Sequence, residues 1–71
     1  MKLPRDVTGE EAVRALKRLG FEVVRQRGSH IRMTNGSRSV TIPAHSPIAT
    51  GTLRSLLRQA GVSDEAFARE L

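Results

Sequence analysis

The chain of 71 residues contains no cysteine, no tryptophan and no tyrosine. Without cysteine, disulfides and thiolate metal sites are excluded. Two phenylalanines are its only aromatic residues, which argues against base stacking on single-stranded nucleic acid and favours recognition through backbone charge and shape. No apolar run approaches the ~20 residues of a membrane span, and the N-terminus has no run of signal-peptide length. We therefore expect a cytoplasmic protein with no membrane partner.

Acidic residues are also scarce: 7 of them face 12 basic ones, which gives a net charge of +5. Ten of the basic residues are arginine, whose planar fork suits phosphate better than a point charge does. A polyanionic partner is predicted, although an arginine-rich or thermostable composition would give the same balance. The length allows one small domain over residues 1–71, and a hydrophobic fraction of 38% predicts that it folds.

A first amphipathic helix is predicted over residues 7–19. Thr8 is placed to cap it, and Glu11, three residues later, completes a capping box. Ala12 and Leu16 share one face of the cylinder, and Gly20 ends the helix.

From Phe21 the hydrophobic period changes to two, which predicts three antiparallel strands. A three-residue loop that ends at Gly28 connects the first two strands, and a two-residue turn at Asn35 and Gly36 connects the second and third. The predicted pairs are Val23 with Ile31, Phe21 with Met33, Arg32 with Ser39, His30 with Thr41, and Ile31 with Val40. Both registers place the apolar residues on one side of the sheet.

A second helix follows Pro43 and a proline-bounded loop that holds His45. Its apolar positions have helical spacing and are Leu53, Leu56, Leu57 and Ala60, and Gly61 provides the stop. Ser63 caps a short third helix within residues 63–71, in which Phe67 and Leu71 form one apolar stripe. The fold class is therefore α+β, in the order helix, three strands, helix and a short helical tail. Both main helices cover one sheet face, so the face with His30 stays open.

The tripeptide Gly28, Ser29, His30 is the main candidate for chemistry. Histidine takes or gives a proton near neutral pH, and Arg25, Arg27 and Arg32 lie nearby in the sequence. Such a cluster binds a phosphate beside a proton-transfer group. RNA carries its own nucleophile in the 2′-hydroxyl, so its cleavage needs proton transfer and cationic groups but no metal. The alternative is that His30 is an exposed strand residue without a functional role.

Other residues carry weaker signals. His30 and His45 lack paired ligand spacing, which disfavours a metal site; His45 is instead a loop-fixing or substrate-contacting residue. Thr50 and Thr52 are predicted to cap the second helix, although its start also offers N–H groups for an anion. Arg54 either reaches phosphate or lies on the solvated side of the helix.

Three segments, VVRQRGSHIRM, VTIPAH and IATGTLRSLLRQAGV, in this order and spacing, resemble the HicA toxins, a family of small ribonucleases in toxin–antitoxin systems. The resemblance covers about residues 5–62. It implies a fold like a double-stranded RNA-binding domain, cleavage of messenger RNA with His30 as the catalytic residue, and inhibition by a HicB-like antitoxin. Many members carry a second histidine where this chain has Ile31. An antitoxin interface at Val24, His30 and Arg32 would explain the exposed Val24.

The resulting hypothesis is a metal-independent ribonuclease toxin without a cofactor. His30 is its general base or acid, and Arg27 and Arg32 stabilise phosphate. The full set of candidate substrate-binding residues is Arg27, Gly28, Ser29, Arg32, His45 and Arg54. The alternatives are an RNA-binding module without catalysis and a degenerate toxin that only binds its antitoxin.

Overall fold

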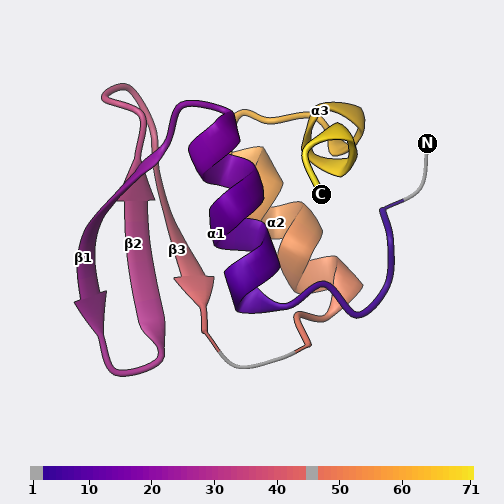
Figure 1. The fold of residues 1–71 in the computed structure, drawn as a ribbon, viewed down its shortest axis with the longest axis horizontal. Coiled ribbons are helices and arrows are strands. Elements are labelled where there is room, and N and C mark those ends of the chain that lie inside the picture. The colour runs from indigo at the N-terminus through magenta and orange to yellow at the C-terminus, as the bar shows by residue number, and fades with distance from the viewer. Residues whose placement is uncertain (1–2, 45–46) are drawn as a thin grey trace.

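The computed structural model describes residues 3–44 and 47–71 (Figure 1). Its elements in chain order are α1 Gly9–Arg18, β1 Glu22–Arg27, β2 His30–Thr34, β3 Ser39–Pro43, α2 Thr50–Ala60 and α3 Asp64–Arg69. The predicted order and the α+β class are therefore confirmed. His45 and its predicted role lie outside the described residues.

The start of α1 has the predicted capping box. The Thr8 hydroxyl accepts a hydrogen bond from the Glu11 N–H at 3.1 Å, and the Glu11 carboxylate accepts one from the Thr8 N–H at 2.9 Å. The bond from the Thr8 backbone is the largest cause that lowers the pKa of Glu11 below its ordinary value. One face of this helix buries Ala12, Ala15 and Leu16.

The sheet has the strand order β1-β2-β3 and is antiparallel throughout. Helices α1 and α2 lie on one side of it, next to β3, and β1 is the edge strand farthest from them (Figure 1). On the helix side, Met33, Val40 and Ile42 are buried in one core with the apolar faces of the helices. Every residue of β1 is exposed. The predicted two-layer arrangement with one uncovered sheet face is therefore present.

The predicted register of the first hairpin is wrong. Gly28 and Ser29 form a two-residue turn between Arg27 and His30, with Gly28 in the left-handed region at a φ of +58°. Pairing is regular from this turn to Arg25, which lies opposite Arg32, and a bulge then resets it. Ile31 pairs with Gln26 instead of the predicted Val23, and Met33 pairs with Val23 instead of the predicted Phe21.

The second register is also wrong, by two residues. Gly36, with a φ of +95°, and Ser37 form the turn, because Asn35 stands before it and its side chain accepts from the N–H groups of Ser37 and Arg38 at 2.9 and 2.7 Å. The observed pairs are Ile31 with Ile42, Arg32 with Thr41, His30 with Pro43, and Thr34 with Ser39. A shift of two keeps each side chain on its predicted face.

Helix α2 buries the predicted Leu53, Leu56, Leu57 and Ala60 and ends at Gly61, whose φ is +70°. The prediction that Thr50 or Thr52 caps it is wrong. Ala49 is the N-cap residue, and no side chain makes a cap hydrogen bond there.

Helix α3 is capped as predicted, because the Ser63 hydroxyl accepts from the Ala66 N–H at 3.1 Å. Phe67 is fully buried, whereas Leu71 is 45% exposed. The predicted stripe of these two residues is wrong, since the helix ends at Arg69, before a second turn brings Leu71 to the core. None of the helices formed by residues 3–44 and 47–71 is long and apolar enough to cross a membrane.

Candidate functional site

The side of the sheet that faces away from α1 and α2, here called the open face, carries three rows of side chains. Residues directly opposite each other on antiparallel strands project to the same side. From the Gly28–Ser29 turn onward, the rows are Arg27–His30–Pro43, Arg25–Arg32–Thr41 and Glu22–Thr34–Ser39. The candidate histidine and three arginines therefore occupy two adjacent rows.

His30 is the first residue of β2 and is exposed to solvent. Arg27 lies directly across from it on β1. On the side of β3, the backbone of the preceding residue is also held, because the Ala44 N–H, just past the end of β3, donates to the Ser29 carbonyl at 2.6 Å. The backbone at His30 is therefore held by hydrogen bonds to both neighbouring strands, and its imidazole is accessible to a large ligand.

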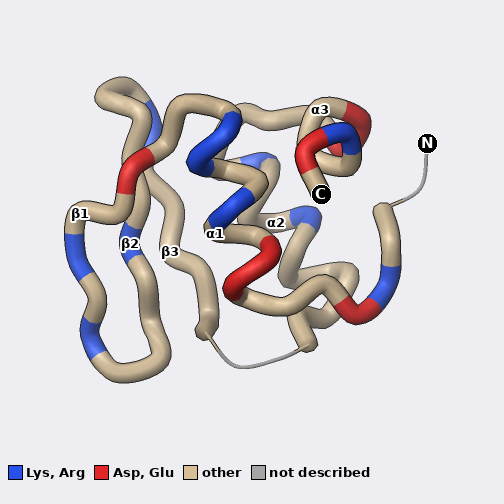
Figure 2. Tube along the Cα trace, viewed as in Figure 1, with Lys and Arg blue, Asp and Glu red and all other residues tan. Residues whose placement is uncertain are grey.

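Arg32 occupies the centre of the open face. Its guanidinium donates from Nη1 to the Thr41 hydroxyl at 3.4 Å, a long hydrogen bond that directs the side chain across β3. Positive charge follows β1 and β2 along these two rows, and the acidic Glu22 lies near the other end of β1 (Figure 2). The cationic part of the open face is therefore bounded on one side by a carboxylate.

One predicted site residue among the described ones, Arg54, is not part of this cluster. Arg54 lies on α2 and forms an ion pair of 3.9 Å with Asp64 of α3, in which the two side chains are 55% and 36% exposed. An exposed pair of this kind contributes little to stability. His45 lies outside the described residues.

Arg25 was not among the predicted substrate-binding residues. Val23 faces the helices opposite Met33. Regular alternation along β1 would put Arg25 and Arg27 on that same side. The bulge between Val23 and Arg25 brings both arginines to the open face. Val24 itself is 56% exposed; it stands at the bulge, and the register assigns it to no row.

Two hollows formed by described residues lie away from the open face. A cavity of about 330 Å³ lies between α1 and the end of α3, and another of about 280 Å³ is lined by Glu10, Val13, Arg14 and Ile31. Neither cavity includes a residue of the open face. Among the described residues, no three histidine or acidic side chains come together as metal ligands would. A ligand of the open face would therefore bind an exposed strand surface through hydrogen bonds and charge.

Together, the fold and the open face define a small α+β domain with a histidine and arginines on an uncovered sheet surface, a class suited to polyanion binding. The family profile described as HicA toxin of bacterial toxin–antitoxin matches residues 9–62. The chain therefore belongs to the HicA toxin family, and membership implies an antitoxin partner. Comparisons with curated proteins and with solved structures gave no match. The matched segment contains the whole sheet and ends just before the Ser63 cap of α3.

Proposed function

We propose that this toxin is a metal-independent endoribonuclease that cleaves messenger RNA on the open face, with His30 as its catalytic residue. One observation carries the proposal: an exposed histidine lies directly opposite Arg27 and one row from Arg25 and Arg32. This places a proton-transfer group beside cations that attract a phosphodiester.

The reaction uses the nucleophile that RNA contains. The 2′-oxygen attacks the neighbouring phosphorus, the bond from phosphorus to the 5′-oxygen breaks, and the products end in a 2′,3′-cyclic phosphate and a 5′-hydroxyl. One proton leaves the 2′-hydroxyl and another reaches the 5′-oxygen, and His30 carries one of these two transfers. Arg27 and Arg32 stabilise the charge that develops on the phosphoryl oxygens.

The glycine and serine of the motif position the histidine. Gly28 supplies the left-handed backbone that allows a two-residue turn, and this turn starts β2 at His30. Ser29 is exposed in the same turn, so its hydroxyl is free to orient the RNA backbone next to the reacting phosphate.

The antitoxin partner, a HicB-like protein in this proposal, inhibits the toxin by covering the open face. His30 and Arg32 are exposed there, and Val24, which precedes Arg25 at the bulge, adds an exposed apolar side chain. An apolar side chain makes no favourable contact with RNA phosphates, whereas its burial against a protein partner contributes favourable free energy to binding.

The test compares RNA cleavage by the wild type and by His30→Ala in the presence of a metal chelator. Proton transfer by a positioned side chain contributes ~10²- to 10⁴-fold, so we expect a loss of that size in the variant and full activity of the wild type without metal. Arg14→Ala is the matched control, since Arg14 is exposed on α1, away from the open face. Undiminished cleavage by a folded His30→Ala protein would refute the catalytic assignment, and loss of wild-type activity with chelator would refute the metal-independent reaction.

A further inference from the structure

We propose that Arg25 and Arg32 form a second phosphate subsite on the open face, next to the row of His30, and that the guanidinium of Arg32 contacts both this phosphate and the scissile one. In this view the toxin holds two successive phosphates of one RNA strand that runs along β1 and β2. The identification of the first phosphate as the scissile one rests on the proposed ribonuclease function. Binding at the second row rests on the structure of the sheet.

The bulge in β1 separates this row from the apolar part of the strand. A two-residue turn without a bulge would pair Val23 with Thr34 and direct this valine to the open face. The bulge instead leaves Val23 opposite Met33 on the helix side while Arg25 stays opposite Arg32. Bulges often re-aim side chains next to functional sites. In this sheet the bulge keeps the apolar and the cationic parts of β1 on opposite faces.

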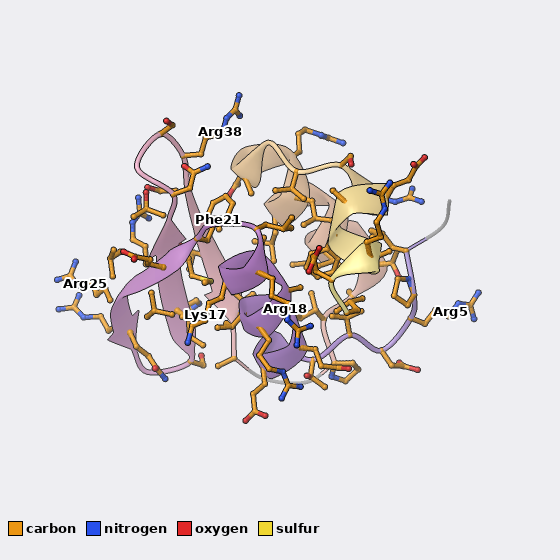
Figure 3. The ribbon with its side chains drawn as sticks, turned by 45° about the horizontal axis from the view of Figure 1, so that its top comes forward. Arg5, Lys17, Arg18, Phe21, Arg25 and Arg38 are labelled. Atoms are coloured by element: carbon orange, nitrogen blue, oxygen red, sulfur yellow. The ribbon has the colours of Figure 1, made fainter. Side chains whose placement is uncertain are left out.

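The two positive charges of the Arg25–Arg32 row favour binding of an anion. Side chains directly opposite each other on antiparallel strands have Cβ atoms about 5 Å apart, where two like charges destabilise the sheet. The ion pair present among the described residues, Arg54 with Asp64, does not involve Arg25 or Arg32. Figure 3 shows Arg25 extending from the sheet into solvent, away from the helices. A phosphate between the two guanidinium groups would turn their repulsion into two charge-assisted hydrogen bonds.

The spacing of the two rows fits a single strand of RNA. His30 and Arg32 are two residues apart on β2, which separates their rows by about 6.6 Å along the strand. This is close to the distance between successive phosphates of an extended nucleic-acid strand. The hydrogen bond from Arg32 to Thr41 fixes one of the two guanidinium groups toward β3 on the open face, so part of the subsite is formed before RNA binds.

The third row limits how many successive phosphates the open face can bind. It contains Glu22, Thr34 and Ser39, and therefore one carboxylate and no cation. A third phosphate placed there would be repelled by Glu22. The open face thus selects two adjacent phosphates rather than a longer stretch of backbone.

The binding test uses a single-stranded RNA oligonucleotide with every ribose 2′-O-methylated, which cannot be cleaved through the 2′-oxygen. Its affinity is measured against salt concentration for the wild type, Arg25→Ala and the control Arg14→Ala, which removes the same charge from α1. We expect Arg25→Ala to weaken binding about tenfold and to reduce the salt slope by about 0.7, the value for one phosphate contact on a single strand. Equal slopes for the two variants would overturn the subsite.

A second test locates the bound phosphate. In an oligonucleotide with a single unmethylated ribose, only one linkage can be cleaved, and the phosphate on either side of it is replaced in turn by a neutral methylphosphonate. For the wild type we expect kcat/KM to fall about tenfold for one of the two replacements, and for Arg25→Ala we expect no further loss from that replacement. An equal loss in both proteins would show that Arg25 does not contact the neighbouring phosphate.

The two proposals fail in different ways. If the wild type binds the methylated strand with the Arg25-dependent slope but leaves unmodified RNA intact, the subsite stands and the ribonuclease function is wrong. If unmodified RNA is cleaved in a His30-dependent reaction while Arg25→Ala behaves like Arg14→Ala, the function stands and the subsite is wrong.

Discussion

Substitution of Gly9 by alanine tests how the helix layer supports the end of the sheet that carries His30. Gly9 is the first residue of α1, and a Cβ atom added there would lie 2.6 Å from the Pro43 carbonyl oxygen and 2.9 Å from the Ala44 Cα. Both neighbours are backbone atoms, so they cannot turn aside as a flexible side chain would. Pro43 is the β3 partner of His30, and the clash therefore acts on the row of the proposed catalytic residue.

Two opposing effects set the magnitude for Gly9→Ala. Alanine is favoured over glycine within a helix by up to about 1 kcal/mol. Forcing an extra carbon into a packed contact costs about 1–3 kcal/mol. We expect a net loss of about 1–2 kcal/mol, a sizeable part of the roughly 4–11 kcal/mol that a domain of this length has. Each kcal/mol lowers the melting temperature by about 4–8 °C.

Gly51→Ala is the matched control. Gly51 lies in the first turn of α2, and nothing stands within 4 Å of a Cβ atom added there. Without a clash, the same substitution is expected to stabilise by about 0.4–1 kcal/mol. Thermal unfolding followed by circular dichroism measures both variants. If Gly9→Ala melts at or above the wild-type temperature, the close approach of α1 to the end of β3 is wrong.

Further predictions concern the helix cap, the core and the bulge. Because the pKa of Glu11 is lowered by folding, its carboxylate stabilises the fold at pH values above the ordinary pKa of 4.5, and this contribution is lost as the pH falls through the lower pKa of the folded state. Glu11→Gln should therefore lose less stability than the wild type on acidification. An unchanged dependence of stability on pH in the variant would contradict the cap. Phe67→Ala should cost about 3–5 kcal/mol in chemical denaturation, whereas Leu71→Ala, at an exposed position, should stay within about 0.5 kcal/mol; similar losses would place Leu71 in the core. Deletion of Val24 removes the extra residue of the bulge and preserves the pairs on either side of it, so RNA cleavage should persist while binding of the antitoxin weakens; loss of cleavage would show that the bulge itself shapes the site.

The sequence was sufficient to predict the order of elements and the faces of the strand residues 30–34 and 39–41. Alternation with a period of two fixes the face, and an error of two residues in the second turn leaves it unchanged. The register itself was not predictable from the Asn35–Gly36 pair, because the Asn35 side chain accepts from the turn N–H groups instead of entering the turn.

The bulge in β1 left no comparable signal in the sequence. Val23 and Val24 are adjacent apolar residues, which a regular strand would send to opposite faces. Val24 is the extra residue of the bulge, so Arg25 lies on the open face, whereas regular alternation from Val23 would have put it on the helix side. The predicted cap of α2 was also wrong, because the N-cap residue is Ala49, which has no side chain able to cap, and the two threonines follow it inside the helix.

Helix α3 lies outside the segment that matches the family, yet it completes the core of this chain. Its Phe67 is fully buried, and the Arg18 guanidinium of α1 donates to the Glu70 carbonyl at 2.6 Å, at the end of the helix. A cation at a helix C-terminus satisfies a free carbonyl and interacts favourably with the helix dipole. These contacts tie α3 to α1, the helix whose first residue supports the row of His30.

The central claim, that His30 on the open face cleaves RNA through the 2′-hydroxyl of its substrate, is tested most directly by the chemistry of the cut ends. Mass spectrometry of the fragments released by the wild type, with His30→Ala as the blank, identifies both termini of each cut. We predict a 2′,3′-cyclic phosphate, or the monophosphate formed from it, on one fragment and a 5′-hydroxyl on the other. Fragments that end in a 3′-hydroxyl and a 5′-phosphate would contradict the account, because they require attack by water instead of the ribose.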